Sequence, residues 1–162
     1  MDDDLDVLFF QWAAYSRARL STKPERWNGG LYSNCLPLSL AALGLVRAKF
    51  PQARIVVGNI GLGGVQSNAD ALIDFLMLRA SKPDFHAWID WRTGWLDLVG
   101  PSWLERLDCR LGDHKFFSKR HVPPNVKYHL GLADEANVKE FYRLLCQARG
   151  LGPDWDGDCF RR

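Results

Sequence analysis

A cysteine and a histidine in this chain are placed where they could act as a nucleophile and its base. Cys35 follows two residue types that often cap helices, Ser33 and Asn34, and precedes Pro37, which a helix tolerates only in its first turn. At a helix start, unpaired backbone amides and the helix dipole favour a thiolate or a developing oxyanion. His86 lies in a later, strand-like segment, so the two side chains can meet in space although they are distant in sequence.

Each of the two residues also has a purely structural interpretation. A lone cysteine is more often a small buried residue than a nucleophile, and Cys35 could pack beneath Leu36 and Leu40. His86 could be a core histidine whose ring nitrogens are satisfied by hydrogen bonds. The pair is informative because its two members occur in elements that can be brought together.

The spacing of apolar residues predicts the elements that must position this pair. Apolar positions recur at helical intervals after Cys35, which predicts a helix carrying the cysteine at its start. Residues 53–58 and 85–91 are predicted to be strands, and a further strand is expected from Gly94. The sequence therefore predicts an α+β domain in which the helix packs on an antiparallel sheet that carries His86.

A carboxylate that orients the histidine would complete a triad, and Asp97 and Asp90 are the two candidates. If residues 91–94 form the hairpin loop, Asp97 is diagonal to His86, at roughly 7–8 Å between backbones. If only residues 93–94 form the turn, Asp97 lies roughly 13 Å along the sheet from His86, and contact is lost. Asp90 shares a strand face with His86, but it is otherwise expected to be a solvated edge carboxylate.

Taken in order, these segments resemble the core of the transglutaminase-like cysteine proteins, which share a papain-like fold. The resemblance extends over about residues 31–102 and is closest to the lasso-peptide leader peptidases. It implies a catalytic triad of Cys35, His86 and an aspartate on the following strand. The segments that carry it are residues 35–43, 53–58 and 86–90, and the pair Gly94-Trp95.

The chain departs from the family pattern at the third member of the triad. In the family, the strand that begins with Gly-Trp leads to an Asp-Pro pair, whereas here Pro101 is preceded by Gly100. The expected carboxylate is therefore missing from that position, and Asp97 is the natural substitute.

An acyl-transfer site also needs donors directed at the developing oxyanion. The backbone amide of Cys35 is the first candidate, and the side chain of Asn34 is a second if it is not occupied in capping. Asn28 and Tyr32 lie in the glycine-containing loop upstream and could donate as well. Trp88, beside His86 in sequence, is one of several tryptophans that could line a peptide groove.

We expect one domain over residues 1–162. It would comprise an N-terminal helix and loop in 1–30, a catalytic-like core in 31–107, and a C-terminal extension of strands and a helix in 108–162. Outside the segments already named, the expected elements are helices over 2–20, from Ser67 or Asn68 to about Ala80, from Pro101 through Leu107, and from Asp134 to Gly150, with strand-like stretches at 116–117 and 126–130.

The composition is that of an ordinary folded domain. The 162 residues are 47% hydrophobic and 25% charged, and the net charge of +2 is too small to argue for a nucleic-acid partner. No apolar run approaches the roughly 20 residues of a membrane span. The four cysteines are widely spaced, and the start of the chain has no apolar signal region, so we expect free thiols and a cytoplasmic protein.

No metal site or cofactor is expected. Cys109, His114, His121 and His129 contain ligand types, but their spacing matches no paired zinc-binding motif. The alternating carboxylates of residues 154–158 lack the glycine position and downstream glutamate of a calcium loop.

The expected activity is acyl transfer to and from Cys35, with a peptide or protein as substrate. Peptide hydrolysis is the leading prediction because of the resemblance to leader peptidases. Transglutamination, deamidation or acyl transfer by an effector or toxin would use the same triad with another acceptor or target. A non-catalytic peptide-binding module on the same fold is the alternative from a different class.

Overall fold

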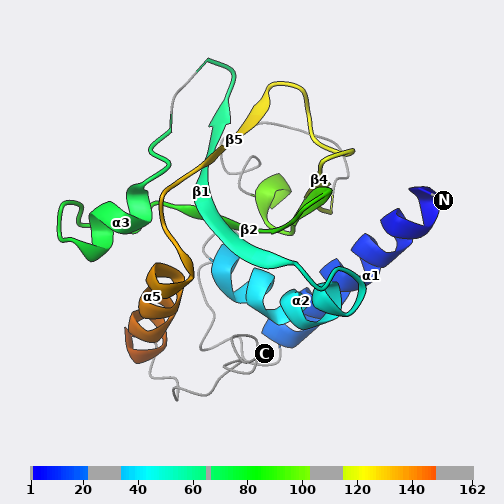
Figure 1. Ribbon diagram of the computed structural model, residues 1–162, viewed down its shortest axis with the longest axis horizontal. Helices are drawn as coiled ribbons and strands as arrows, with labels where there is room; N and C mark the ends of the chain where they lie inside the picture. The colour runs from blue at the N-terminus through cyan, green and yellow to red at the C-terminus, as the bar shows by residue number, and fades with distance from the viewer. Residues whose placement is uncertain (1, 22–33, 65–66, 103–114, 149–162) are drawn as a thin grey trace.

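The computed structural model describes residues 2–21, 34–64, 67–102 and 115–148 and shows an α+β arrangement (Figure 1). Its helices are α1 (Asp2–Ser21), α2 (Cys35–Lys49), α3 (Ala71–Leu76) and α5 (Glu135–Ala148), and its strands are β1 (Arg54–Leu62), β2 (His86–Trp91), β3 (Gly94–Asp97), β4 (Phe117–Ser118) and β5 (Val126–Leu130).

The strands form one antiparallel five-stranded sheet in the order β4-β3-β2-β1-β5. This sheet is strongly curled. In a flat sheet, strands three positions apart would be separated by about 14 Å. Nevertheless Tyr128 of β5 packs on Trp95 of β3, with 4.4 Å between ring centroids. The curl therefore brings the β5 edge over the concave face of β3, where His86 also points.

The two faces of the sheet have separate cores. The convex face, with Val57, Ala87, Ile89 and Leu96, packs on α2 and α1 in the main hydrophobic cluster. The concave face carries a smaller cluster around Ile60, Phe117 and Val126, against which Trp95 and Tyr128 pack. Helix α2 is buried along most of its length, because it packs against both α1 and the sheet.

Helix α1 confirms the helix expected over 2–20 and packs along α2 (Figure 1). Phe9, Trp12 and Ser16 are buried, whereas Tyr15 is exposed. The segment after residue 114 is held against α1, since Arg17 donates to the carbonyl of Lys115 and Asp6 pairs with His121. The first described residues of the C-terminal extension, 115–121, are therefore packed on the N-terminal helix.

One predicted helix is much shorter than expected. The helix expected to run from residue 67 or 68 to about 80 is the six-residue α3, preceded by a turn in which the side chain of Asn68 accepts from the Asp70 amide. It ends where Leu78 adopts a positive φ of 59°, a backbone conformation that no α-helix continues through. The helix expected from Pro101 is seen only in residues 100–102, and its remainder lies outside the described residues.

The described strands and helix of the C-terminal extension lie close to where they were predicted. Strand β5 matches the predicted strand 126–130, and β4 overlaps the predicted stretch 116–117. Helix α5 begins after Asp134 as expected. Its start is closed by reciprocal hydrogen bonds, in which Asn137 N–H donates to the Asp134 carboxylate and Asp134 N–H donates to the Asn137 side chain.

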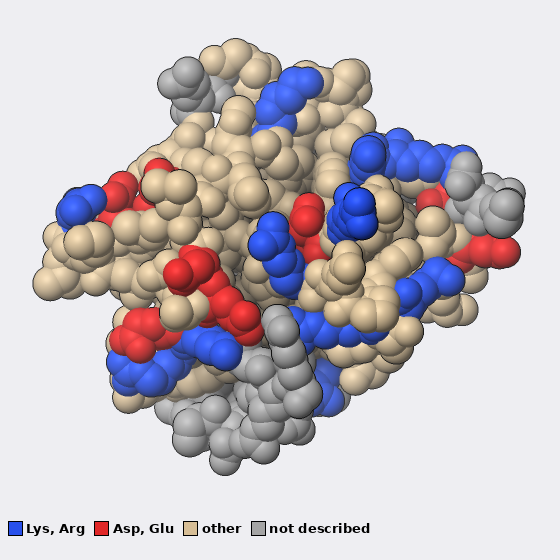
Figure 2. All heavy atoms as spheres, in the orientation of Figure 1, with Lys and Arg blue, Asp and Glu red and all other residues tan. Residues whose placement is uncertain are grey.

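No helix in the described ranges is both long and apolar enough to cross a membrane. On the face drawn in Figure 2, acidic and basic side chains of the described residues are interspersed and separated by uncharged surface, with no field of a single sign.

Candidate active site

Cys35 is the first residue of α2, as the capping pattern predicted. It is a free, buried cysteine, and Asn34 occupies the cap position immediately before it. The side chain of Asn34 makes no capping hydrogen bond, so it is not occupied in closing the helix. The sulfur therefore lies at the end of α2 where backbone amides have no helical partner.

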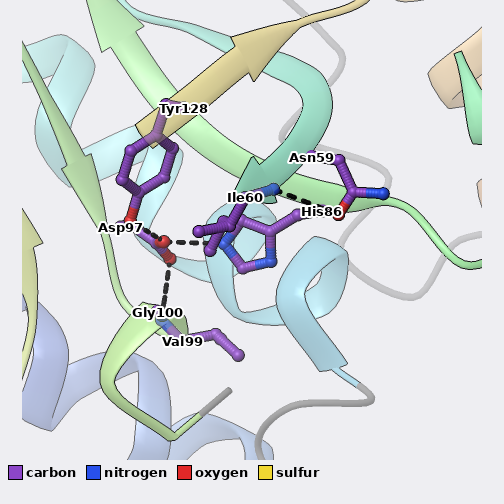
Figure 3. A network of polar contacts seen from close by, with 7 residues as sticks. All are labelled: Asn59, Ile60, His86, Asp97, Val99, Gly100 and Tyr128. Carbon is purple, nitrogen blue, oxygen red and sulfur yellow. Dashed lines mark hydrogen bonds and ion pairs between the residues drawn. The ribbon is translucent and has the colours of Figure 1, made fainter. Parts of the chain in front are cut away.

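His86 is the first residue of β2, and its imidazole lies between the carboxylate of Asp97 and the thiol of Cys35 (Figure 3 shows the carboxylate side of this arrangement). Its Nε2 is 2.6 Å from Oδ2 of Asp97. The ring is also hydrogen-bonded to the side chain of Cys35. Because Nε2 is engaged by the carboxylate, Nδ1 is the ring nitrogen left for the sulfur.

The Asp97 carboxylate receives four hydrogen bonds in a fully buried position. The amides of Val99 and Gly100 donate to Oδ1 at 2.9 and 3.0 Å. His86 Nε2 lies 2.6 Å from Oδ2, and the Tyr128 hydroxyl donates to the same oxygen at 2.5 Å (Figure 3). A carboxylate has about four lone-pair sites, so the ionised form is satisfied here without water.

The register of the β2–β3 hairpin explains why Asp97 reaches the histidine. Asp90 lies opposite Trp95, and Trp91 lies opposite Gly94. This is the register expected to bring Asp97 to His86. The turn is shorter than the expected four-residue loop: it contains only residues 92 and 93, because Trp91 and Gly94 belong to the strands. The alternative register, with Asp97 opposite Asp90, does not occur.

Gly100 provides the space that the Asp97 carboxylate occupies. A Cβ at this position would lie 2.5 Å from Oδ2 of Asp97, 2.5 Å from the ring of Phe117 and 2.8 Å from the Tyr128 hydroxyl. Residue 100, where the resemblance implies an aspartate, is thus a glycine, and the carboxylate that reaches His86 comes from three residues upstream. With any side chain at residue 100, the Asp97 carboxylate could not keep its observed position, because the two would overlap.

The charge states follow from the burial and the contacts of the two groups. Burial by itself lowers the pKa of His86, but the charge of Asp97, its hydrogen bond, and the hydrogen bond and charge of Cys35 raise that pKa to about 10. Burial by itself raises the pKa of Asp97, but His86 and the hydrogen bonds from Tyr128 and Val99 hold it below the ordinary value. At neutral pH the pair is an imidazolium and a carboxylate.

The segment that enters β2 is fixed by Asn59 of β1. Its side-chain amide donates to the carbonyls of Asn68 and Asp84 at 3.0 and 2.9 Å, and its oxygen accepts from the amide of Ile60 (Figure 3). Since Asp84 lies two residues before His86, these bonds fix the path of the chain into the histidine.

Asp90, the alternative third residue, is not brought to the histidine. It lies opposite Arg54 of β1, at the other end of β2 from His86, and it is only partly buried. Burial raises the pKa of Asp90, while the charge of Arg54 lowers it. Trp88, in contrast, is buried and lies nearly parallel to the His86 ring at 6.0 Å between centroids.

Tyr128 is the residue of this network that the sequence did not single out. It comes from β5, at the far side of the sheet from β3, so strand pairing gave no sign of the contact. Burial, followed by the charge of Asp97 and the hydrogen bond to it, raises the pKa of Tyr128 well above its usual range. Tyr128 therefore remains a hydroxyl donor at any physiological pH.

The remaining candidate residues are the upstream donors and the possible metal ligands. Asn28 and Tyr32, the upstream donor candidates, lie outside the described residues, as do Cys109 and His114. His121 is paired with Asp6 at 2.8 Å. In the part of the chain that the structure describes, no three histidine, cysteine or acidic side chains are grouped as a metal site would require.

Two pockets of about 350 Å³ each lie away from the triad. One is lined by α2, β1 and the start of α5, with Arg47 and Arg54 in its wall. The other is mainly apolar and lies between α1 and the β2–β3 turn, against Phe9 and Trp91. Neither contains the sulfur or the imidazole.

Comparison with known proteins finds no matching family model, no matching curated protein and no matching solved structure. The likeness to transglutaminase-like cysteine proteins therefore depends on the residues of this chain alone.

Proposed function

We propose that this protein is a cysteine-dependent acyl-transfer enzyme, and that it acts as a peptidase that cleaves an amide bond through an acyl-enzyme on Cys35. The observation that supports this is a row of three buried side chains. The Cys35 sulfur lies at a helix start, the His86 imidazole is hydrogen-bonded to it, and the other ring nitrogen of His86 is hydrogen-bonded to the Asp97 carboxylate. An imidazolium beside a sulfur is the setting in which cysteines become nucleophilic.

In the proposed reaction, the Cys35 thiolate, whose proton is carried by Nδ1 of His86, attacks the carbonyl carbon of the substrate amide and forms a carbon–sulfur bond. The carbon–nitrogen bond then breaks, and His86 gives its Nδ1 proton to the leaving amine. The neutral imidazole next takes a proton from water, whose oxygen attacks the thioester and displaces the sulfur. The carboxylic acid leaves, and the imidazolium is restored.

Asp97 would hold the ring in place and balance its charge throughout the cycle. The amide of Cys35 and the side chain of Asn34 are the candidate donors to the developing oxyanion. Asn34 is buried and directly precedes Cys35 at the start of α2.

Peptide hydrolysis is preferred over amine transfer because the motifs resemble those of the leader peptidases. Transglutamination or deamidation uses the same groups, and the difference is whether water or an amine attacks the thioester. The alternative from another class is a peptide-binding module without catalysis. The structure gives this alternative little support, because Trp88 and Trp91 of the β2–β3 hairpin, which were expected to line a peptide groove, are buried.

The experiment that tests the proposal is iodoacetamide alkylation, located by peptide mass spectrometry, in wild type and His86→Gln. Cys146 is the internal control, since it is also a buried, free cysteine. We expect Cys35 to react selectively at pH 7, and His86→Gln to slow that reaction at least about 100-fold, the usual contribution of a positioned acid–base group. Equal rates at Cys35 and Cys146, unaffected by the substitution, would leave only the binding module.

A further inference from the structure

The Tyr128 hydroxyl is directed at the same Asp97 oxygen that holds the imidazole. It donates to Oδ2 at 2.5 Å, while His86 Nε2 lies 2.6 Å from that atom. The other oxygen is already occupied by two backbone amides. Without the tyrosine, one lone-pair site of a fully buried carboxylate would have no donor.

The surroundings of the tyrosine fix this hydroxyl. Its ring is wedged between Trp88 and Trp95, with centroid distances of 5.0 and 4.4 Å, and it lies 6.3 Å from the His86 ring. The absence of a side chain at Gly100 leaves the room in which the hydroxyl and the carboxylate meet. The two tryptophan rings and the space at Gly100 therefore fix where the hydroxyl meets the carboxylate.

We propose that Tyr128 is a positioning residue, which fixes the orientation and the ionised state of Asp97 so that the imidazole of His86 is held toward Cys35. The inference rests on the proposed function for its catalytic meaning. It also gives the C-terminal extension a role. Strand β5 pairs with β1 in the sheet, and the Tyr128 hydroxyl on β5 lies on the concave face. The raised pKa of Tyr128 agrees with this role, since a tyrosinate could not donate.

The test compares Tyr128→Phe with Tyr142→Phe by NMR at neutral pH. Each substitution removes one hydroxyl, from the partly buried Tyr128 or the buried Tyr142, and in Tyr128→Phe the phenylalanine keeps the ring that packs on Trp88 and Trp95. The readout is the side-chain Nε2–H resonance of His86. In Tyr128→Phe we expect its chemical shift to change and its exchange with solvent to become at least about tenfold faster, the value of one hydrogen bond to a charged group. Tyr142→Phe should change neither.

A second measurement links this to reactivity. Alkylation of Cys35 at pH 7 should be about tenfold slower in Tyr128→Phe than in wild type and unchanged in Tyr142→Phe. If wild-type Cys35 is not selectively alkylated, the proposed function fails, and the NMR comparison still decides whether Tyr128 positions Asp97. A His86 resonance that is the same in wild type and Tyr128→Phe overturns the inference, whatever the alkylation rates.

Discussion

Gly100 is the residue at which a single added methyl group should dismantle the candidate triad. In Gly100→Ala, a Cβ would lie 2.5 Å from Asp97 Oδ2 and 2.8 Å from the Tyr128 hydroxyl, so the carboxylate must move. We expect a loss of about 1–3 kcal/mol in the free energy of unfolding, typical of overpacking, together with slower Cys35 alkylation. Urea denaturation and mass spectrometry measure the two effects.

The control for this substitution is Gly44→Ala, in the middle of α2. A Cβ there meets no heavy atom within 4 Å. Replacing a helical glycine by alanine should therefore stabilise the protein by about 0.5–1 kcal/mol and leave alkylation unchanged. Equal behaviour of the two variants would contradict the view that Gly100 is a space reserved for Asp97.

The two candidate aspartates differ enough to be separated by substitution. Asp97→Asn removes the counter-charge of a buried imidazolium and should cost about 3–5 kcal/mol in the free energy of unfolding. It should also lower the pKa of His86, since burial would then act without its main opposing charge. Asp90→Asn, which affects a partly exposed residue near Arg54, should cost less than about 1 kcal/mol.

These two measurements, urea denaturation and an NMR titration of the His86 ring, also decide between the two carboxylates as the third member of the triad. A pKa of His86 that falls in Asp90→Asn and not in Asp97→Asn would assign the role to Asp90.

Among the elements, the start of α5 offers the simplest prediction. Asp134→Ala removes the acceptor for the Asn137 amide, which lies in the first turn of the helix. We expect a loss of about 1 kcal/mol in the free energy of unfolding, as for other helix caps. Asp134→Asn keeps the side-chain acceptor and should cost much less. Thermal denaturation of both variants measures the difference, and equal losses would show that the charge near the helix start matters and the hydrogen bond does not.

The elements that were predicted correctly are those specified by local patterns. The spacing of apolar residues after Cys35 and the cap at Asp134 specify α2 and α5 without reference to the rest of the chain. Helix α3 was overestimated, because its apolar pattern continues beyond the point where Leu78 turns to positive φ. The choice between Asp97 and Asp90 depended on the hairpin register, and more than one register was compatible with the sequence.

Tyr128 could not have been found in this way. Its contact with Asp97 depends on how strongly the whole sheet curls, which is set by twist and by the packing on both faces. A strand pattern predicts which residues share a face of the sheet. It does not predict which strands that are not neighbours come into contact when the sheet curls. The contact between His86 and Asp97, which lie on neighbouring strands, could therefore be predicted, but the contact with Tyr128 could not.

For the molecule as a whole, the buried pair predicts how stability depends on pH. Because the folded pKa of His86, about 10, exceeds its unfolded value of 6.5, its contribution is complete below pH 6.5 and is lost as the pH rises through 10. Because the folded pKa of Asp97 is below the ordinary aspartate value of 3.8, its contribution is present above that pH and is lost as the pH falls through the lower folded value.

The contribution of this pair to the free energy of unfolding should therefore be greatest near pH 4–6.5. It should fall by a few kcal/mol toward pH 10. Urea denaturation at a series of pH values measures this. His86→Gln should be less stable than wild type at pH 6 and should show a flatter alkaline limb. Parallel limbs in the two proteins would mean that other groups cause the alkaline loss.

The curl of the sheet also bears on when the site becomes complete during synthesis. Tyr128 follows Asp97 by 31 residues. At roughly 5–20 residues per second, the ribosome needs about 2–6 s to add them. During that interval a nascent chain carries the thiol, the imidazole and the carboxylate, but not the hydroxyl that fixes the carboxylate. If Tyr128 acts as proposed, a truncated chain that ends before β5 should have a less reactive Cys35 than the full chain.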